Sequence, residues 1–150
     1  EPEDTMESLK AKQKHLLESI PSKKIKVSYH ETPTSLLEGV LARGDRRLSA
    51  VLYSAYKKGC KFDSWDEHFK FDAWMEAFEE NNLDPYFYTQ RRRDFSEVLP
   101  WDHLDYGISR KFLERENIKA HENETTPHCR IQCAGCGANK LNGGHCDARG

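Results

Sequence analysis

Residues 32–59 read TPTSLLEGVLARGDRRLSAVLYSAYKKG and contain two helix patterns in direct succession. Thr32 and Pro33 are residue types typical of an N-cap and of the first helical position. Apolar residues then recur at the spacing of one helix face on either side of Gly44, a typical helix stop. They are Leu36, Leu37, Val40 and Leu41, then Leu48, Val51, Leu52, Ala55 and Tyr56. We therefore expect two helices, the second capped by Asp45 and ended by Gly59.

Helix signals continue on both sides of this pair. Residues 3–20 have the pattern of a charged helix with a thin apolar stripe. Asp72 and Ser109 are typical caps for two later helices, and residues 64–67, Ser-Trp-Asp-Glu, fit the capping-box pattern. Asp84 and Pro85 begin an aromatic stretch that we expect to be rich in turns. The sequence therefore predicts a mainly α fold.

One short segment has a different period. Ile25, Val27 and Tyr29 alternate with polar residues up to His30, which is the alternation of a β-strand. A single strand cannot form a sheet. We therefore expect this strand to belong to a larger sheet, and the chain to be part of a longer protein.

Composition limits the classes of function. Apolar residues make up 37% of the chain and charged residues 32%, and the formal net charge is -2. This net charge does not indicate nucleic-acid binding. The chain shows no secretory leader and no apolar run of membrane length. We expect a soluble, cytoplasmic protein or a piece of one, with no membrane partner.

Four of the five cysteines lie within 18 residues near the end of the chain. Cys129, Cys133 and Cys136 form a C-x3-C-x2-C run, and His145 and Cys146 follow. A disulfide framework spreads its cysteines more evenly, so the bunching favours reduced thiolates, which are ligands for zinc and for iron–sulfur clusters. A fourth ligand is expected from Cys146, His145 or His128. The alternative is a disordered tail with unpaired thiols.

Other polar motifs are compatible with chemistry but have simpler explanations. Arg46 and Arg47 follow Asp45 at a helix N-terminus, where positive charge is unfavourable, and they are candidates for a phosphate or carboxylate clamp. From spacing alone, a solvated turn capped by Asp45 is the better explanation. Residues 62–69 and 99–105 mix histidine, carboxylates and aromatics, and are more simply caps and turns.

Taken together, these motifs resemble the C-terminal region of a family of cobalamin-binding-domain radical S-adenosylmethionine (SAM) proteins. The resemblance runs in order from Val27 to Cys136, about three quarters of the chain. The matching pieces are SLLE (35–38), ARGDRRL (42–48), GCKFD (59–63), WDEHF (65–69), Trp74 with Ala77-Phe78, DPYFY (84–88), VLPWDHLD (98–105), TTP (125–127) and the cysteine run.

The resemblance implies a layout for the full-length protein. A cobalamin-binding-type domain and a radical SAM α/β barrel precede this region in the family. Residues 1–30 would then be the end of the barrel, a helix and its last strand. Residues 31–120 would be a helical extension, and 121–150 a Cys-rich metal-binding tail. SAM, and cobalamin if it takes part, would be bound by parts outside this chain, so the piece alone is not expected to be catalytic.

The resemblance also implies site residues. Cys129, Cys133 and Cys136 would hold an auxiliary iron–sulfur cluster of the 4Fe–4S type, or zinc, with Cys146 or His145 as a further ligand. Family members often end in Cys-Gly-x-Cys, whereas this chain has Asn139 at the last position. Because barrel active sites gather at the C-terminal ends of strands, His30 is the candidate substrate-facing residue. Asp45, Arg46 and Arg47 are candidates for polar contacts nearby.

Two further interpretations remain open. In the first, the chain is a non-enzymatic zinc-binding module that uses the same cysteines and docks a partner protein or RNA. In the second, it is a metal-free scaffold with a disordered tail. The enzyme interpretation makes the rest of the barrel the main partner, and predicts that apolar surface left by its absence favours association.

Overall fold

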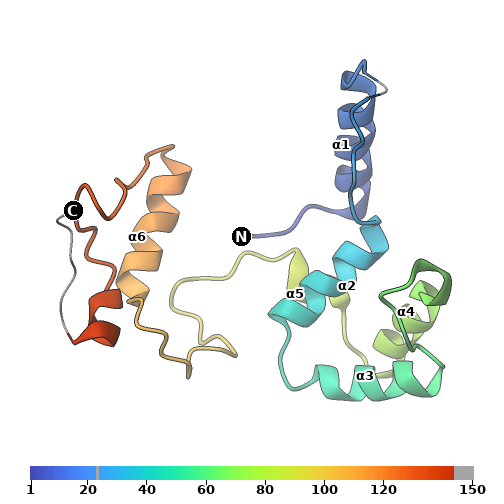
Figure 1. The fold of residues 1–150 in the computed structure, drawn as a ribbon. Coiled ribbons are helices and arrows are strands. Elements are labelled where there is room, and N and C mark those ends of the chain that lie inside the picture. Colours follow the sequence, from blue (N-terminus) through green and yellow to red (C-terminus); the bar gives the residue numbers. More distant parts are fainter. Residues whose placement is uncertain (23, 144–150) are drawn as a thin grey trace. The chain divides into compact units, whose positions relative to one another are not determined.

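The computed structural model describes residues 1–22 and 24–143 (Figure 1). Over these ranges it contains six α-helices, two short 3₁₀ helices and no β-strand, which confirms the mainly α fold. The elements are α1 (Met6–Ser19), α2 (Thr32–Arg43), α3 (Leu48–Lys57), η1 (Asp66–His68), α4 (Phe71–Glu80), α5 (Pro85–Thr89), α6 (Arg110–His121) and η2 (Ala138–Asn142). None of the described helices combines the length and apolar character that a membrane crossing requires.

The chain divides into two compact units, Glu1–Asp94 and Phe95–Gly150, which we call the N-terminal and C-terminal units. The division falls inside the helical extension expected over residues 31–120. The boundaries predicted after residues 30 and 120 refer to the layout of a full-length protein, and they stay predictions.

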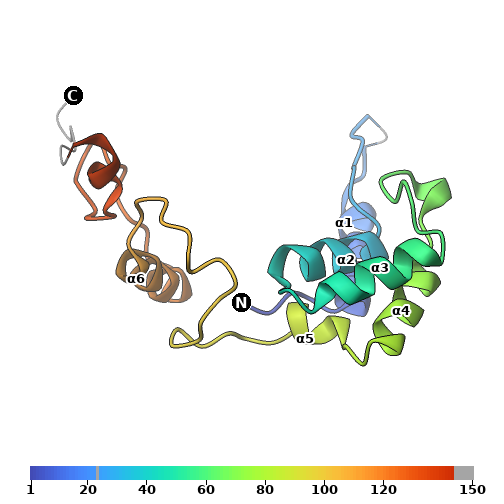
Figure 2. The same ribbon diagram turned by 90° about the horizontal axis from the view of Figure 1, so that it is seen from below.

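The core of the N-terminal unit lies between two helix pairs. Helix α2 packs against α5, and α3 packs against α4 (Figure 2). The buried hydrophobic residues are Leu36, Leu37, Val40, Leu48, Val51, Ala55, Cys60, Trp74, Ala77, Phe78 and Tyr88. Most of the apolar positions predicted in residues 32–59 are among them. Leu41, Leu52 and Tyr56 are exposed instead, because each lies at the edge of its apolar stripe, where no helix covers it.

The two glycines predicted to end helices do so for different reasons. Gly59 has a φ of +84°, and the next amide, Cys60 N, donates to Ala55 O at 3.0 Å, so Gly59 is a left-handed stop as expected. Gly44 has a φ of −76° and is not left-handed. A Cβ at Gly44 would lie 1.9 Å from Leu48 Cδ1 and 2.8 Å from Val40 O, so the close approach of α2 and α3 excludes a side chain there.

Several predicted N-caps are shifted. Asp45 is not the cap of α3, because Arg47 occupies that position and no side chain caps the helix. Thr32 is not a cap, because Glu31 occupies that position and Thr32 is buried in the first turn of α2. Asp72 lies within the first turn of α4, after the cap position. The predicted capping box over residues 64–67 forms no side-chain cap on η1. In each case the observed cap lies one or two residues from the predicted one.

One other cap was correctly located. The side chain of Ser109 accepts from Phe112 N at 3.3 Å and caps α6. The turns expected after Asp84 are replaced by the short helix α5, and Asp84 caps it by accepting from Tyr86 N at 2.9 Å.

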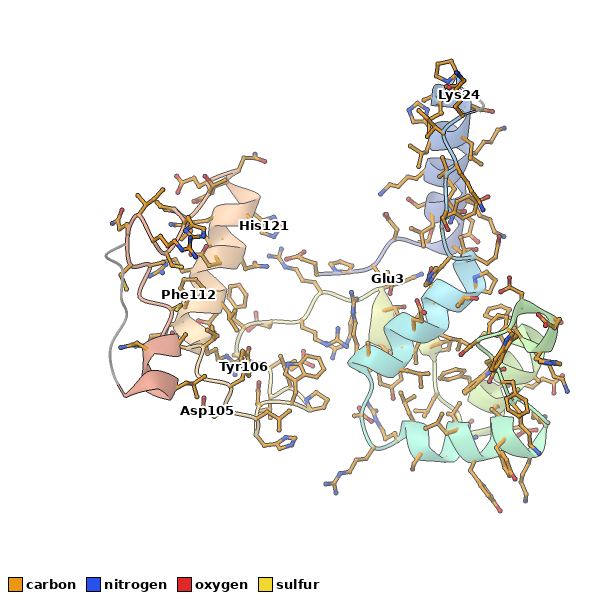
Figure 3. The ribbon with its side chains drawn as sticks, in the orientation of Figure 1. Glu3, Lys24, Asp105, Tyr106, Phe112 and His121 are labelled. Carbon is orange, nitrogen blue, oxygen red and sulfur yellow. The ribbon has the colours of Figure 1, made fainter. Side chains whose placement is uncertain are left out.

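The predicted strand ending at His30 is not formed in the part of the chain that the structure describes. After α1 the chain reverses near Lys24 and runs back along α1, and Gln13 Nε2 donates to His30 O at 3.0 Å (Figure 3). A strand requires a neighbouring strand for its backbone hydrogen bonds, and the described residues offer none. We call residues 4–31 the N-terminal arm; within it α1 buries no residue.

The core makes a direct prediction about stability. Phe78 is 2% exposed, whereas Phe62 is 67% exposed. We expect Phe78→Ala to lower the free energy of unfolding by about 3–5 kcal/mol, because it removes buried surface and leaves a cavity. Phe62→Ala is the matched control and should change it by less than about 1 kcal/mol. Urea unfolding followed by circular dichroism measures both, and equal effects would contradict the assigned core.

Candidate metal centre in the cysteine loop

Residues 95–143, the described part of the C-terminal unit, form no hydrophobic core. Among its described residues only Gly107 is buried, and the side chains of Trp101, Ile108 and Phe112 are half-buried. Leu104, Leu113, Ile118, Ile131 and Leu141 are between 45% and 80% exposed. Hydrogen bonds, rather than apolar burial, therefore hold this unit together.

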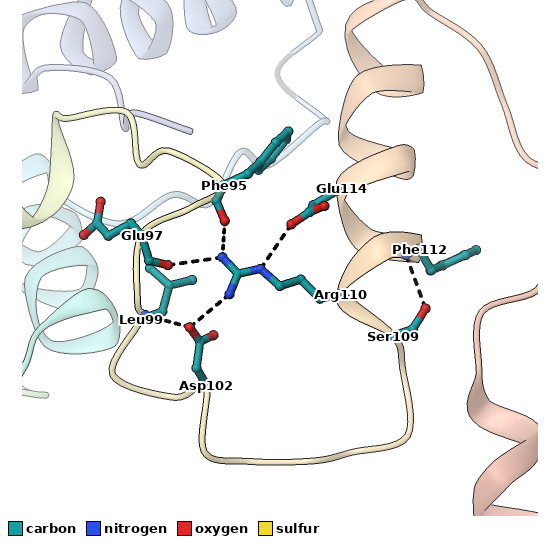
Figure 4. Close-up of polar contacts among 8 residues, drawn as sticks. All are labelled: Phe95, Glu97, Leu99, Asp102, Ser109, Arg110, Phe112 and Glu114. Atoms are coloured by element: carbon teal, nitrogen blue, oxygen red, sulfur yellow. Dashed lines mark hydrogen bonds and ion pairs between the residues drawn. The ribbon is translucent and has the colours of Figure 1, made fainter.

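Arg110 makes the densest set of these bonds (Figure 4). Its guanidinium donates to the carbonyl oxygens of Phe95 and of Glu97, the latter at 3.1 Å. It also lies 3.3 Å from Asp102 Oδ2 and 3.1 Å from Glu114 Oε1. Asp102 in turn accepts from Leu99 N at 2.8 Å. One side chain at the start of α6 thus fastens the preceding loop to the helix.

A second set of contacts holds the chain after α6. Thr126 Oγ1 donates to Glu116 Oε2 and accepts from Lys119 Nζ at 3.1 Å. Both partners belong to α6. The segment that leads into the cysteines is therefore attached along the helix.

Cys129, Cys133 and Cys136 lie within residues 128–137, which we call the cysteine loop. At its start, His128 O accepts from Ile131 N at 2.8 Å, and His128 Nδ1 accepts from Arg130 N at 3.2 Å, which closes a turn around Cys129. At its end, Ser109 N donates to Cys136 O at 2.8 Å. The loop therefore leaves α6 at its C-terminus and returns to its N-terminus.

Gly137 is needed where the loop returns. Its φ is +97°, and a Cβ there would lie 2.9 Å from Gly107 O and 3.3 Å from Ser109 N. Both atoms are backbone and cannot move aside cheaply. Gly135 is also left-handed, with a φ of +65°, but a Cβ there would meet nothing within 4 Å.

The donor set suits a soft metal, but the described conformation is not a closed site. Cys129 and Cys133 are exposed, Cys136 is half-buried, and all three thiols are free. Within residues 1–22 and 24–143, no three His, Cys, Asp or Glu side chains are grouped so that they could hold a metal ion. His145 and Cys146, the predicted further ligands, lie outside the described residues. The three thiolates would thus have to converge when a metal binds.

Asn139, which stands where the family often has a thiol, is in η2 and half-buried. The alternative fourth ligand His128 is exposed and uses its Nδ1 within the turn. Its Nε2 is the nitrogen that a metal would meet.

The candidate substrate residues do not form one site in this chain. His30 precedes α2, and its Nδ1 lies 3.3 Å from Oε2 of Glu38 within that helix. Asp45 follows the C-terminal end of α2. The 12 residues of α2 separate them. A helix of that length spans about 18 Å. Their roles toward a substrate stay predictions.

Arg47 is occupied within the fold. Its guanidinium lies 2.6 Å from Asp45 Oδ2 and stacks 5.4 Å from the centre of the Phe87 ring, which Arg91 approaches at 4.5 Å. The hydrogen bond from Arg47 holds the pKa of Asp45 below its usual value. Of the expected clamp, only the exposed Arg46 is left to meet a ligand.

Sequence reasoning did not identify Arg110 or the aromatic stack on Arg47. The one available signal for the contacts of Arg110 was its four-residue spacing from Glu114, which is typical of an ion pair on a helix. Phe87 lies 40 positions from Arg47, so no local pattern links them.

The Asp45–Arg47 pair predicts a pH dependence of stability. Because the folded pKa of Asp45 is lowered, the pair stabilises the protein above the unfolded pKa of about 3.9 and loses this contribution as pH falls through the folded value. Asp45→Asn keeps an acceptor for the hydrogen bond from Arg47 N but removes the charge. It should lower the free energy of unfolding by about 0.5 kcal/mol at neutral pH, a small value because both groups face water. Denaturant titration should show this difference shrinking as pH falls below the unfolded pKa of about 3.9, and a constant difference at every pH would contradict the pair.

The glycines of the loop give a second prediction. Gly137→Ala should weaken hydrogen-exchange protection of the Ser109 amide by about tenfold or more, because a strained backbone and a clash add together. Gly135→Ala is the matched control, since it adds only backbone strain. Exchange monitored by NMR reports the amide directly, and equal losses in the two variants would show that the contact at Gly107 is not made.

A scan against protein-family models, a search of curated proteins and a search of solved structures each found no match to this chain. The assignment of a function therefore depends on the residues and contacts described above.

Proposed function

We propose that this chain is the C-terminal part of a radical SAM enzyme, and that its cysteine loop carries an auxiliary iron–sulfur centre. The observation that carries the proposal is three free thiols within eight residues in a unit whose described residues bury no hydrophobic side chain. The ordered likeness of the motifs from Val27 to Cys136 to the radical SAM family supports the enzyme class.

The described residues of the C-terminal unit bury no hydrophobic side chain. Units of a few tens of residues seldom fold by hydrophobic burial alone, and natural ones add disulfides, a metal or a partner. No described cysteine forms a disulfide. Metal–thiolate bonds supply folding free energy directly, so a metal accounts both for the clustered cysteines and for the absent core.

The proposed ligands are Cys129, Cys133 and Cys136, with Cys146 or His145 as a fourth. If the fourth is absent, one iron stays open to a small ligand or substrate. The centre would position a substrate or carry electrons for chemistry on the barrel. SAM, and cobalamin where it takes part, would be held by parts of the protein outside this chain.

The N-terminal arm supports a missing partner domain. Leu16, Leu17, Ile25 and Tyr29 are between 44% and 59% exposed. Exposed apolar side chains often mark a surface that another part of a protein covers. Here they lie on α1 and on the following segment with a strand pattern, which fits the end of a barrel whose other strands belong to parts of the protein outside this chain. We place the whole protein in the cytoplasm, where thiols stay reduced.

The test is anaerobic purification of the chain as wild type, Cys133→Ser and Cys60→Ser. Cys60 is the matched control, because it is buried in the N-terminal core and burial raises the pKa of its thiol. We expect iron, sulfide and a visible absorption band in the wild type and in Cys60→Ser, and their loss in Cys133→Ser. In the metal-bound protein, alkylation should spare Cys129, Cys133 and Cys136, which react once the metal is removed.

The other outcomes discriminate between functions. Stoichiometric zinc without colour, lost in Cys133→Ser, would contradict the iron–sulfur centre and favour a zinc-binding interaction module. Absence of any metal from the wild type, even after reconstitution with iron and sulfide, would contradict both.

A further inference from the structure

The outer face of α3 combines exposed tyrosines with positive charge. Its residues follow the three- and four-residue spacing that places side chains on one side of a helix. They are Arg46, Ser49, Ala50, Tyr53, Tyr56 and Lys57, with Lys61 just beyond the helix, and we call them the α3 platform. All seven are exposed, and the buried residues Leu48, Val51 and Ala55 lie on the opposite side.

The rings on the platform are open to solvent. Tyr53 is 62% exposed and Tyr56 is 57% exposed. Ser49 and Ala50, the residues that precede Tyr53 on this face, are small and do not obstruct approach to its ring, whereas Lys57 lies over the ring. An exposed tyrosine on a helix does not by itself indicate a binding site. The charged side chains around the rings therefore determine which kind of ligand this face would attract.

The platform residues themselves carry only positive charge, and the acidic residues Asp45, Asp63, Glu76 and Glu80 border them. Residues 46–62 contain five Lys or Arg and no Asp or Glu. Two of the five are neutralised, since Arg47 pairs with Asp45, and Lys58 lies 2.8 Å from both Glu76 and Glu80. Arg46, Lys57 and Lys61 form no ion pair with any residue that the structure describes. Arg46 does not serve the helix either, because a cation at a helix N-terminus is unfavourable.

The free cations are positioned on the rings. Lys57 Nζ lies 5.0 Å from the centre of the Tyr53 ring, and Lys61 Nζ lies 4.8 Å from that of Tyr56. Each tyrosine is thus paired with an ammonium group that can meet a phosphate next to a base stacked on the ring. Alternation of stacking rings and cations is how proteins bind single-stranded nucleic acid without reading its sequence.

The aromatic surface continues past the helix. Phe62 has a φ of +61° and is 67% exposed, and its ring meets that of Trp65 at 5.8 Å. A left-handed backbone at a bulky residue costs free energy that burial would ordinarily offset. Here the ring is presented to solvent instead, which fits a contact surface.

We propose that the α3 platform binds single-stranded RNA, with bases stacked on Tyr53 and Tyr56 and phosphates held by Arg46, Lys57 and Lys61. Unstacked bases in single-stranded regions are the usual form in which RNA is recognised by aromatic side chains. The net charge of the whole chain, -2, does not reveal that these three cations lie within residues 46–61. The inference goes beyond the proposed metal centre and is independent of it, since the platform lies in the other unit.

The experiment uses the full 150-residue chain and a labelled, unstructured RNA of about 12 nucleotides, a length within known single-strand site sizes. Fluorescence anisotropy measures Kd at several salt concentrations. Replacing Tyr53 and Tyr56 by Ala should weaken binding by about tenfold or more. Replacing Arg46, Lys57 and Lys61 by Gln should reduce the slope of log Kd against log salt by about 2, since each single-strand phosphate contact contributes about 0.7.

Matched controls separate the platform from general effects. Tyr106→Ala removes a tyrosine that is 55% exposed in the C-terminal unit, and Lys10→Gln removes an exposed lysine of α1. Neither should change Kd. Tyr53→Leu with Tyr56→Leu keeps apolar volume if the alanine variant fails to fold, and should weaken binding similarly. Cys133→Ser should leave Kd unchanged, whatever the outcome for the metal centre.

Several results would overturn the proposal. They are no binding at low salt, equal losses in the platform and control variants, or equal affinity for duplex RNA, which offers no base faces. Tighter binding to DNA of the same sequence would overturn the assignment to RNA. Binding to vesicles of anionic lipid, with none to RNA, would assign the platform to a membrane surface instead.

Discussion

The uneven distribution of hydrophobic burial is the constraint on which the rest of the structure depends. Every buried hydrophobic side chain among the described residues belongs to the N-terminal unit, between Leu36 and Tyr88. The C-terminal unit is instead held by single polar contacts, such as Arg110 with its loop and Ser109 N with Cys136 O. Contacts of this kind contribute about 1 kcal/mol each, so a unit built from them has little stability to spare. A metal held by thiolates is the strongest additional source of stability that its sequence offers.

Most of the helices could be predicted from the sequence, although α5 was expected to be turns, and the helix ends could be predicted only in part. The apolar spacing in residues 32–59 located α2 and α3 because amphipathic periodicity is a local property. Gly59 was recognisable because a left-handed stop has its own residue preference. Thr32 was misassigned as a cap because its burial depends on residues distant in sequence. The segment ending at His30 has a strand pattern but no partner strand among the described residues, and a pattern in one segment cannot supply that partner.

The candidate sites show the same limit. The spacing of Cys129, Cys133 and Cys136 identified donor atoms, but whether three thiolates converge depends on the loop and on the ion itself. Asp45 and Arg47 were noted as polar candidates, and their pairing is local, but the stack of Arg47 on Phe87 joins residues distant in sequence. The α3 platform was not predicted, because the net charge of the whole chain is slightly negative. The platform becomes visible only when its exposed residues, none of them acidic, are grouped on one face of the helix. Local sequence patterns thus located the groups, and packing decided their partners.

The central claim is that a metal on the cysteine loop supplies the stability that burial does not. Amide hydrogen exchange over residues 95–143, recorded by NMR with and without bound metal, tests it most directly. We expect protection to rise on metal binding across this unit, including the Ser109 amide, while the amides of α2 to α5 stay unchanged. The rise should be absent in Cys133→Ser and present in Cys60→Ser. Strong protection of the C-terminal unit without metal, unaltered by metal or by Cys133→Ser, would contradict the claim.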